Sequence, residues 1–527
     1  MRPLALVAAL ALLPAASGAA GPPQAAGRHA MVVTEQREAT RAGLATLRAG
    51  GNAVDAAVAV AYALAVVDPC CGNIGGGGFM LVRTAAGRER FIDFRERAPL
   101  RATRDMYLDA RGQAVASQSR TGWKAVAVPG TVLGLETART EFGTMSRASL
   151  MAPAIALARD GFQLAPGDVV PFAGSARAGA LLFANGSPRA GDRLTQPRLA
   201  RTLEAIAAGG AATFYRGPIA RAIVRASQAG GGVLTLEDFD RYRVEESAPV
   251  RCRFRGYVVA SAPPPSSGGV TLCEILNVIA AYPLEHWGWH STRSVHYVTE
   301  AERRAFADRN AYLGDPDFVK NPVAQLLAPA YAARLRAQIA PERATPSRDV
   351  RPGLSAEPPE GRHTTHFSIV DRWGNAVAVT YTLNDWFGAG VVAGDTGFFL
   401  NDEMDDFTAK PGVANMYGLV QGGRNAIAPG KRPLSSMAPT IVTHDGKLAM
   451  VTGSPGGPRI ITTVLETILN ALVYRTGVRA AVDAPRTHMQ WLPDRLEYEP
   501  GAFSAATARA LERMGYALSP VAQWGSA

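Results

Sequence analysis

The chain has 527 residues, 47% of them hydrophobic, so it is long enough to bury a large core. Its net charge of +10 arises from 55 Lys and Arg against 45 Asp and Glu, and the basic residues are spread without a cluster. This dispersion argues against a nucleic-acid partner or a membrane-surface protein, and four cysteines are too few for a disulfide scaffold.

Residues 1–19 have the features of an export signal. Arg2 supplies a minimal basic region, residues 4–13 form an apolar run, and the small residues Ser17 and Ala19 suit cleavage. The alternative is a short N-terminal helix of the mature fold. We therefore predict a secreted or periplasmic protein, in which disulfides are permitted.

Two helices are predicted over residues 38–49 and 53–67, because two glycines end the first and Asn52 is a suitable N-cap for the second. The segment 53–67 is the most apolar stretch after the export signal. It is shorter than a membrane span and Asp55 interrupts it, so we predict a buried core helix.

Residues 79–83 and 90–94 favour a pair of strands around a short turn, and Arg95 follows directly. The preceding run of four glycines, 75–78, indicates either a tight turn that needs positive φ or a phosphate loop. A phosphate loop is disfavoured, because the Gly-Lys-Ser/Thr ending of such loops is missing.

The four cysteines allow one plausible bridge. Neighbouring cysteines rarely satisfy disulfide geometry, so Cys70 and Cys71 are not expected to pair with each other. A bridge between Cys252 and Cys273 is possible, although no pattern in the sequence requires it.

Residues 145–230 are predicted to be helical, 256–261 to be a strand, and the stretch up to about 340 to be helical again. Within it, three histidines have loosely metal-like spacing, but no HExxH motif is present, and we expect no metal. These histidines are His286, His290 and His296.

Residues 341–363 mark the clearest break in the chain. They are rich in proline and charge and lack a hydrophobic period, so they are predicted not to order themselves. Strand-like patterns follow, including a hairpin over 440–453, and then a helix from about 459 to 474. Helices, then strands, then a helix indicate an α+β layered fold.

Thr364 stands at the end of the break and opens a strand. Cleavage before it would give one residue both a hydroxyl and an α-amino group, whose ordinary pKa of ~7.7–8.0 suits a general base. The alternative is an ordinary strand threonine. A two-residue turn at Trp373-Gly374 would pair Thr382 with Thr365, and Leu383 with Thr364, which would bring a second hydroxyl within reach.

Three polar loops complete the candidate chemistry. Residues 453–459 follow a strand and open a helix, so the N–H groups of Gly456 and Gly457 could bind an oxyanion. The acidic stretch 402–407 and the basic, hydroxylated stretch 432–437 could bind the ammonium and carboxylate of an amino acid. Taken alone, each could equally be a solvated loop.

Together these stretches resemble the γ-glutamyltransferase family of N-terminal nucleophile hydrolases, from about residue 30 to the C-terminus. The matching motifs, in chain order, are GGNAVDAAVA, GNIGGGGFM, IDFRERAP, PPPSSGG, ADRNAYLGDPDFV, TTHFS, TYTLN, NDEMDDF, KRPLSSM and TGSPGGPRI.

The resemblance implies a four-layer αββα sandwich made from one precursor. A large subunit, 20–363, would end in the processed linker 341–363 at His363. A small catalytic subunit, 364–527, would begin at Thr364 and would be truncated at its C-terminus, since the family continues further.

The resemblance also implies a role for each site residue. Thr364 would be the nucleophile with Thr382 as its partner. The substrate carboxylate would be held by Arg95, Ser435 and Ser436, and the ammonium by Asn384, Glu403 and Asp406. Gly456 and Gly457 would form the oxyanion hole, and Tyr417 would belong to a lid.

The implied reaction cleaves the γ-glutamyl amide of glutathione and related compounds without a metal or organic cofactor, and passes the γ-glutamyl group to water, an amino acid or a dipeptide. No nucleic-acid partner is expected, and no membrane span once the signal is removed. Two rival functions are a cephalosporin (glutaryl) acylase-like amidase of the same fold and an uncleaved exported binding protein.

Overall fold

The computed structural model describes residues 25–183, 186–354, 365–413, 416, 419 and 422–527. The predicted export signal over 1–19, the processing site at His363 and Thr364, and Tyr417 therefore lie outside the described residues.

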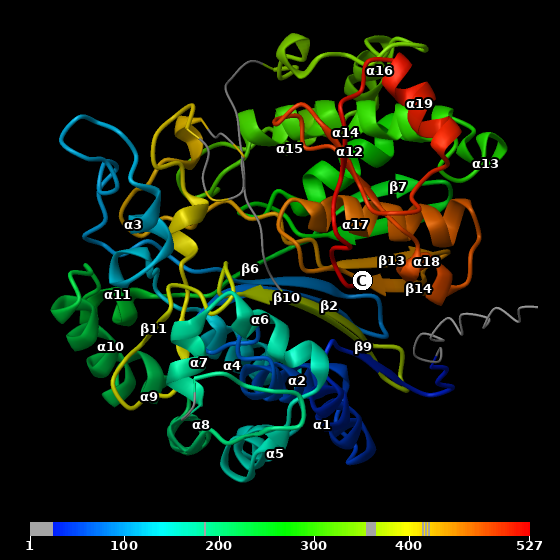
Figure 1. Cartoon of the computed structure of the whole chain (residues 1–527). Helices are drawn as coiled ribbons and strands as arrows, with labels where there is room; N and C mark the ends of the chain where they lie inside the picture. The colour runs from blue at the N-terminus through cyan, green and yellow to red at the C-terminus, as the bar shows by residue number, and fades with distance from the viewer. Residues whose placement is uncertain (1–24, 184–185, 355–364, 414–415, 417–418, 420–421) are drawn as a thin grey trace, which may run out of the picture.

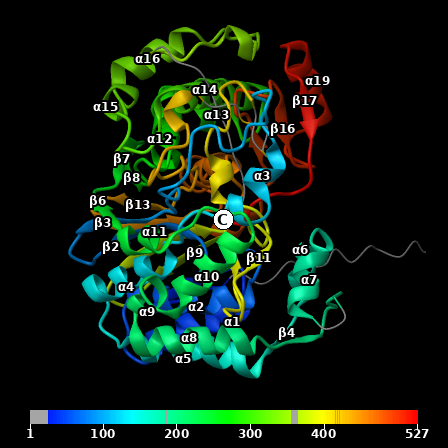
Figure 2. The ribbon, with the colours of Figure 1, turned by 90° about the vertical axis from the view of Figure 1, so that its left-hand side faces the viewer.

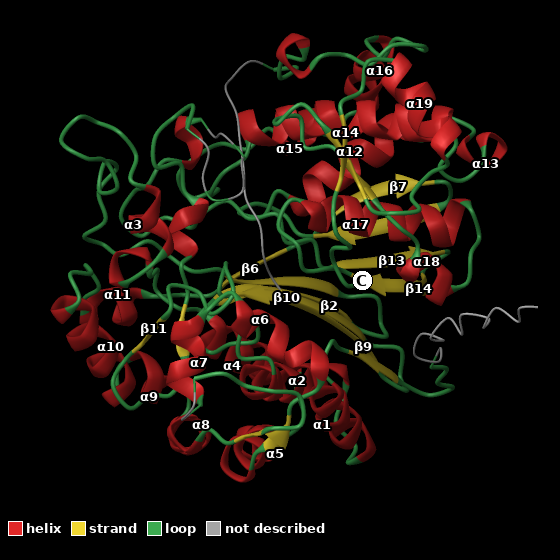
Figure 3. Ribbon diagram, viewed as in Figure 1, coloured by secondary structure: helices red, strands yellow, loops and turns green. Residues whose placement is uncertain are grey.

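Two stacked antiparallel sheets form the centre of the molecule, and helices cover the outer face of each (Figures 1 and 3), which confirms the α+β, four-layer αββα prediction. The first sheet consists, in spatial order, of β1 (Met31–Val33), β9 (Thr365–Val370), β10 (Ala376–Thr382), β2 (Gly77–Arg83), β3 (Glu89–Phe94) and β6 (Glu245–Ser247). The second consists of β14 (Lys447–Thr452), β13 (Thr440–His444), β8 (Tyr257–Ser261) and β7 (Val250–Phe254). Small apolar residues such as Ala378 and Ala260 pack between them.

The first outer layer contains α1 (Arg37–Arg48), α2 (Ala53–Val67), α4 (Thr131–Phe142), α5 (Arg147–Asp160) and α8 (Pro197–Gly209). Every residue of α2 is buried, which confirms the predicted core helix. Asn52 caps α2 together with Asp55, and the Ala53 N–H donates to Asp371 Oδ2 at 2.9 Å. The start of α2 is thereby fixed to the loop between β9 and β10.

The second outer layer lies on the opposite side of the sandwich (Figure 2). Its main helices are α12 (Gly268–Ile279), α14 (Thr292–Tyr312), α16 (Pro329–Ala337) and α17 (Arg459–Ile468). A short π-helical segment, Leu469–Val473, continues α17. The possible Cys252–Cys273 bridge is present and joins β7 to α12.

Shorter elements complete the described chain. The helices are α3 (Ala116–Arg120), α6 (Val170–Ala173), α7 (Ala176–Leu182), α9 (Ala211–Tyr215), α10 (Pro218–Ala229), α11 (Leu236–Arg241), α13 (Leu284–Trp287), α15 (Val323–Leu326), α18 (Val478–Asp483) and α19 (Ala505–Arg513). The strands are β4 (Phe162–Gln163), β5 (Arg193–Leu194), β11 (Val391–Val392), β12 (Phe399–Leu400), β15 (Thr487–His488), β16 (Leu496–Tyr498) and β17 (Leu518–Pro520). Among the helices described, none combines the length and apolar character of a membrane span.

The predicted register of the β9–β10 hairpin is wrong by one residue. The turn contains three residues rather than two, because Asp371 pairs with Asn375 and Gly374 takes a φ of +90°. As a result Thr365 lies opposite Tyr381, and Thr382 pairs with Gly77 of β2. The predicted pairing of Leu383 with Thr364 lies outside the described residues.

The glycine run 75–78 does not need positive φ, which corrects the tight-turn prediction. Instead it allows close backbone approach, because a Cβ at Gly76 would lie 1.9 Å from the Thr382 carbonyl oxygen. Small residues here let β2 start directly against the end of β10.

Two further predictions from local sequence are wrong. Residues 341–354 of the proposed linker are packed onto the body, where buried Ser347 accepts from Arg303 and its carbonyl accepts from Trp491 Nε1 at 2.8 Å. Cys70 and Cys71 form a disulfide with each other in the turn that follows α2.

Candidate active site

Arg95 lies just beyond β3 and is fully buried. Its guanidinium forms ion pairs with Glu403 and with Asp406, while its Nε donates to the Pro433 carbonyl at 3.2 Å. Glu96 adds a third carboxyl group 3.5 Å from the guanidinium. The cluster therefore joins the end of β3 to the 3-10 turn Glu403–Asp406 and to the loop before β13.

Burial dominates the electrostatics of this cluster. It raises the pKa of Glu96 to about 7 and that of Glu403 well above its ordinary range, although the positive charge of Arg95 opposes both shifts. One guanidinium cannot balance three ionised carboxylates in a buried site. The carboxyl groups thus outnumber the guanidinium that they contact, so a cationic ligand would be favoured in this cluster.

Two residues to which sequence reasoning assigned no role hold the loop that carries the predicted serines. Asn425 donates to the Asp406 carbonyl at 2.6 Å and accepts from the Leu434 N–H at 3.0 Å, so it ties the acidic turn to the serine loop. Buried Arg309 of α14 donates to Ser436 Oγ at 2.8 Å. Ser435 is buried beside them, and its N–H donates to the Pro265 carbonyl at 2.9 Å.

Thr382 and Asn384 lie where β10 ends. The Asn384 N–H donates to Thr382 Oγ1 at 2.8 Å, and the Asn384 side-chain amide donates to the Asp402 carbonyl at 3.1 Å. Asn384 has a φ of +80°, a conformation that asparagine tolerates better than most residues. Because Asp402 precedes Glu403, this corner is adjacent to the Arg95 cluster.

Gly456 and Gly457 occupy the loop between β14 and α17, both with positive φ, at 123° and 62°. Their N–H groups have no acceptor among the described residues. Two adjacent unpaired donors before a helix can stabilise an anionic oxygen. The cluster and this loop are thus the two polar parts of the candidate site.

Thr365 and His366 follow the predicted nucleophile. Thr365 is buried, and its hydroxyl donates to Glu35 Oε2 at 3.3 Å. The His366 ring pairs with Thr380 Oγ1 at 2.9 Å and with Ser368 Oγ at 3.0 Å. Burial lowers the pKa of His366 to about 3, so the ring is neutral in the folded protein.

This buried histidine should make the fold acid-sensitive. Between pH 6.5 and pH 3 the unfolded chain binds a proton that the folded chain does not, so stability falls as the pH falls. Between pH 7 and pH 5, the buried neutral His366 should lower the free energy of unfolding by about 2 kcal/mol. We expect His366→Gln to remove this pH-dependent loss of stability, as measured by chemical denaturation at pH 7 and at pH 5. His286→Gln, at an exposed position, is the control, and an unchanged pH dependence in His366→Gln would refute the assignment.

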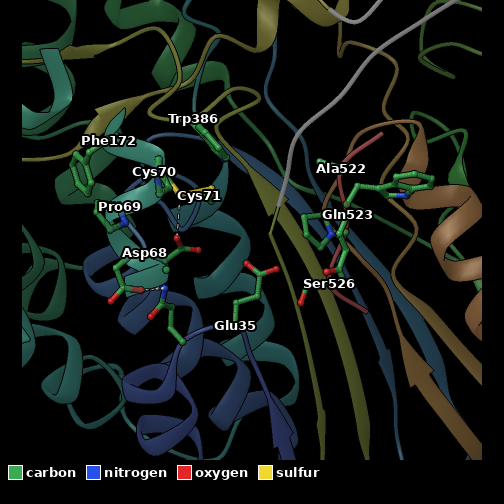
Figure 4. Close-up of a pocket in the computed structure, with 18 of the residues that line it drawn as sticks. Glu35, Asp68, Pro69, Cys70, Cys71, Phe172, Trp386, Ala522, Gln523 and Ser526 are labelled. Atoms are coloured by element: carbon green, nitrogen blue, oxygen red, sulfur yellow. Dashed lines mark hydrogen bonds between the residues drawn. A yellow bond between two sulfur atoms is a disulfide. The ribbon is translucent and has the colours of Figure 1, made fainter. Parts of the chain in front are cut away.

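A cavity of about 500 Å³ lies beside the loop between β14 and α17 that carries Gly456. Figure 4 shows residues that line this cavity. Gly456 and Trp386 border it, together with Asp68, Cys70 and Cys71, whereas none of the Arg95 cluster does. The cavity thus adjoins the candidate site from the side of Gly456. Among the described residues, Asp68, Cys70 and Cys71 are the one group whose spacing would suit a metal ion, but the two sulfurs are joined in a disulfide and do not offer thiolate ligands. The His286, His290 and His296 set is not brought together in this way.

The chain is similar to known proteins in both sequence and structure. The family model described as Gamma-glutamyltranspeptidase matches residues 39–527. A glutathione hydrolase proenzyme of Pseudomonas sp. (strain A14) is 55% identical over 496 residues, covering 92% of this chain and 86% of the relative. A cephalosporin acylase structure from Bacillus halodurans matches with a TM-score of 0.82 and 28% identity, covering 97% of this chain and 93% of the other. A Helicobacter pylori gamma-glutamyltranspeptidase structure matches with a TM-score of 0.61 and 38% identity, covering 63% and 98%.

Proposed function

The chain belongs to the gamma-glutamyltranspeptidase family, and from that membership we propose that it is a self-cleaving γ-glutamyltransferase and glutathione hydrolase. The observation that carries the proposal is the buried cluster of Arg95 with Glu403 and Asp406. A guanidinium and two carboxylates that are already desolvated match the carboxylate and ammonium of an α-amino acid.

The γ-glutamyl group is held by its amino-acid end. Arg95 binds the α-carboxylate, with Ser435 and Ser436 as further hydroxyl donors. Glu403 and Asp406 accept from the ammonium, and Asn384 supports them. Because three buried carboxyl groups surround one guanidinium, the ammonium adds positive charge where the cluster lacks it.

Thr364 is the nucleophile of the reaction. Its hydroxyl attacks the γ-amide carbonyl and passes its proton through the α-amino group of the same residue to the departing amine. The N–H groups of Gly456 and Gly457 stabilise the oxyanion, and Thr382 orients the nucleophile. Water or an amino-acid amine then opens the γ-glutamyl ester. Tyr417 belongs to the lid over this group.

Maturation uses the same hydroxyl. Thr364 attacks the His363 carbonyl, and water opens the resulting ester, which yields a large and a small subunit from one precursor. The proenzyme relative supports such a precursor. The export signal over 1–19 directs the enzyme to a secreted or periplasmic location.

A glutaryl acylase of the same fold is the second candidate, favoured by the similarity to a cephalosporin acylase structure. A glutaryl group has a carboxylate but no ammonium. It would leave the two buried carboxylates without a cationic partner other than Arg95, which is costly in a desolvated site.

The decisive experiment follows the purified protein on a denaturing gel and with two substrates. We expect two bands, the smaller beginning Thr-Thr-His-Phe-Ser, and hydrolysis of glutathione in preference to a glutaryl amide. One uncleaved band without amidase activity would instead identify a binding protein, and preference for the glutaryl amide would identify an acylase.

A further inference from the structure

The cavity beside Gly456 has an unusual wall, formed by the turn that follows α2. In this turn Cys70 and Cys71 are joined by a disulfide, and Asp68 lies two residues before Cys70 (Figure 4). The turn is held in place by backbone contacts: the Phe387 N–H donates to the Cys70 carbonyl at 2.9 Å. The reaction proposed above uses neither sulfur.

The two sulfurs differ in their exposure. Cys71 is half-buried, whereas Cys70 is 5% exposed, and both line the cavity. A thiolate that enters the cavity therefore reaches Cys71 first, and Cys70 becomes the leaving sulfur. Thiol–disulfide exchange needs such an arrangement, because one sulfur must be open to attack and the other must be able to depart.

Asp68 can assist the departure. Its Oδ1 lies 3.1 Å from Cys70 Sγ, and its Oδ2 is buried without a hydrogen-bond partner among the described residues. Burial, reinforced by the carboxyls of Glu35 and Asp168, raises the pKa of Asp68 well above its ordinary range, although hydrogen bonding from the Gly72 backbone opposes the shift. The Asp68 carboxyl is therefore placed to donate a proton to the sulfur that would leave.

The cavity also connects this pair to the acyl-transfer chemistry. Gly456, a candidate oxyanion donor, lines the same space as Cys71. The proposed acyl transfer at that side of the cavity releases an amine. When the substrate is glutathione, that amine is a cysteinyl dipeptide, which carries a thiol.

We propose that Cys70–Cys71 is a thiol–disulfide exchange site for low-molecular-weight cysteine thiols that enter or leave the acyl-transfer centre. The choice of ligand rests on the proposed function. The ligand thiolate bonds to Cys71 Sγ, the Cys70–Cys71 bond breaks, and Cys70 leaves with the electron pair and takes a proton from Asp68. A second thiolate attacks the ligand sulfur and releases Cys71. Two thiols become one small disulfide, and the protein pair becomes a dithiol.

The exchange can be measured on the native enzyme with cysteinylglycine as the probe. After incubation with millimolar cysteinylglycine in the presence of a chelator, the thiols are alkylated and located by peptide mass spectrometry. The buried Cys252–Cys273 bridge does not line the cavity and is the internal control. We expect Cys70 and Cys71 to be alkylated at least about tenfold faster than Cys252 and Cys273. Equal resistance of both bridges would overturn the proposal.

Single variants identify the attacked sulfur. With the disulfide form of cysteinylglycine, Cys70→Ser is expected to gain one mixed disulfide at Cys71, and Cys71→Ser to gain little. The reverse order would contradict the assigned roles. Asp68→Asn should slow reduction of the wild-type pair by at least about tenfold, since it carries no acidic proton. An unchanged rate would remove Asp68 from the mechanism.

A separate assay shows whether a negative result concerns the exchange site or the proposed acyl-transfer function. γ-Glutamyl-p-nitroanilide releases an amine without a thiol, so its turnover reports acyl transfer alone. We expect Cys70→Ser to retain that turnover. Failure of wild-type enzyme to hydrolyse the anilide would refute the proposed function, whereas resistance of Cys70–Cys71 in an active enzyme would refute only the exchange site.

Discussion

Replacement of Thr364 by alanine is expected to leave a single uncleaved chain and to lower γ-glutamyl amide hydrolysis at least about 1000-fold. One hydroxyl is proposed for both maturation and turnover, so both should fail together. The measurements are the band pattern on a denaturing gel and the turnover of γ-glutamyl-p-nitroanilide. Normal two-subunit processing in Thr364→Ala would refute the assignment.

Two variants sharpen this result. Thr364→Ser keeps the hydroxyl and the future α-amino group but loses the methyl group that restricts χ1, so it should process more slowly and still become active. Thr365→Ala is the matched neighbour. It removes a buried hydroxyl that donates to Glu35 but leaves Thr364 in place, and it should still yield two subunits.

Elements whose signals are local were predicted well from sequence. The apolar run and the Asn52 cap predict the helix Ala53–Val67, and the structure adds that Asp55 completes the cap. The hairpin β13–β14 likewise follows from the turn at Asp445 and Gly446, both of which take positive φ.

The register of β9 and β10 was missed for a physical reason. Asp371 Oδ1 accepts from the Trp373 N–H at 2.9 Å and from the Asn375 N–H at 3.0 Å. These side-chain bonds favour a three-residue turn, and they shift every pair by one position. An aspartate three residues before a glycine was the available signal.

Other features could not be inferred, because their causes are distant in sequence. The segment 341–354 is ordered by Arg303 and Trp491, and neither is visible in its own composition. Arg309 lies in the motif ADRNAYLGDPDFV, but its role depends on Ser436, 127 residues further along, which the motif itself does not indicate. The pairing of Cys70 with Cys71 is different, because it is local and depends on the backbone of one tight turn, which the residue types do not specify.

Asp406→Asn tests how the candidate site distinguishes its substrates. Asp406 is buried and pairs with Arg95, and its charge is proposed to accept from the substrate ammonium. Loss of a desolvated charge pair costs roughly 2 to 5 kcal/mol. For γ-glutamyl-p-nitroanilide this corresponds to a fall in kcat/KM of about 30-fold to several thousand-fold.

A glutaryl anilide separates recognition from folding, because it has the carboxylate but not the ammonium. Any misplacement of Arg95 in Asp406→Asn would affect both substrates, whereas loss of the ammonium contact affects only the γ-glutamyl compound. Asp405→Asn is the matched control: Asp405 is a buried carboxyl on the same turn, accepts from Ser119 Oγ at 2.5 Å, and makes no ion pair with Arg95. We expect the ratio of the two activities to fall in Asp406→Asn and to stay near that of the wild type in Asp405→Asn. If Asp406→Asn loses both activities equally, Asp406 serves folding or maturation, and recognition of the ammonium must rest on Glu403 and Asn384.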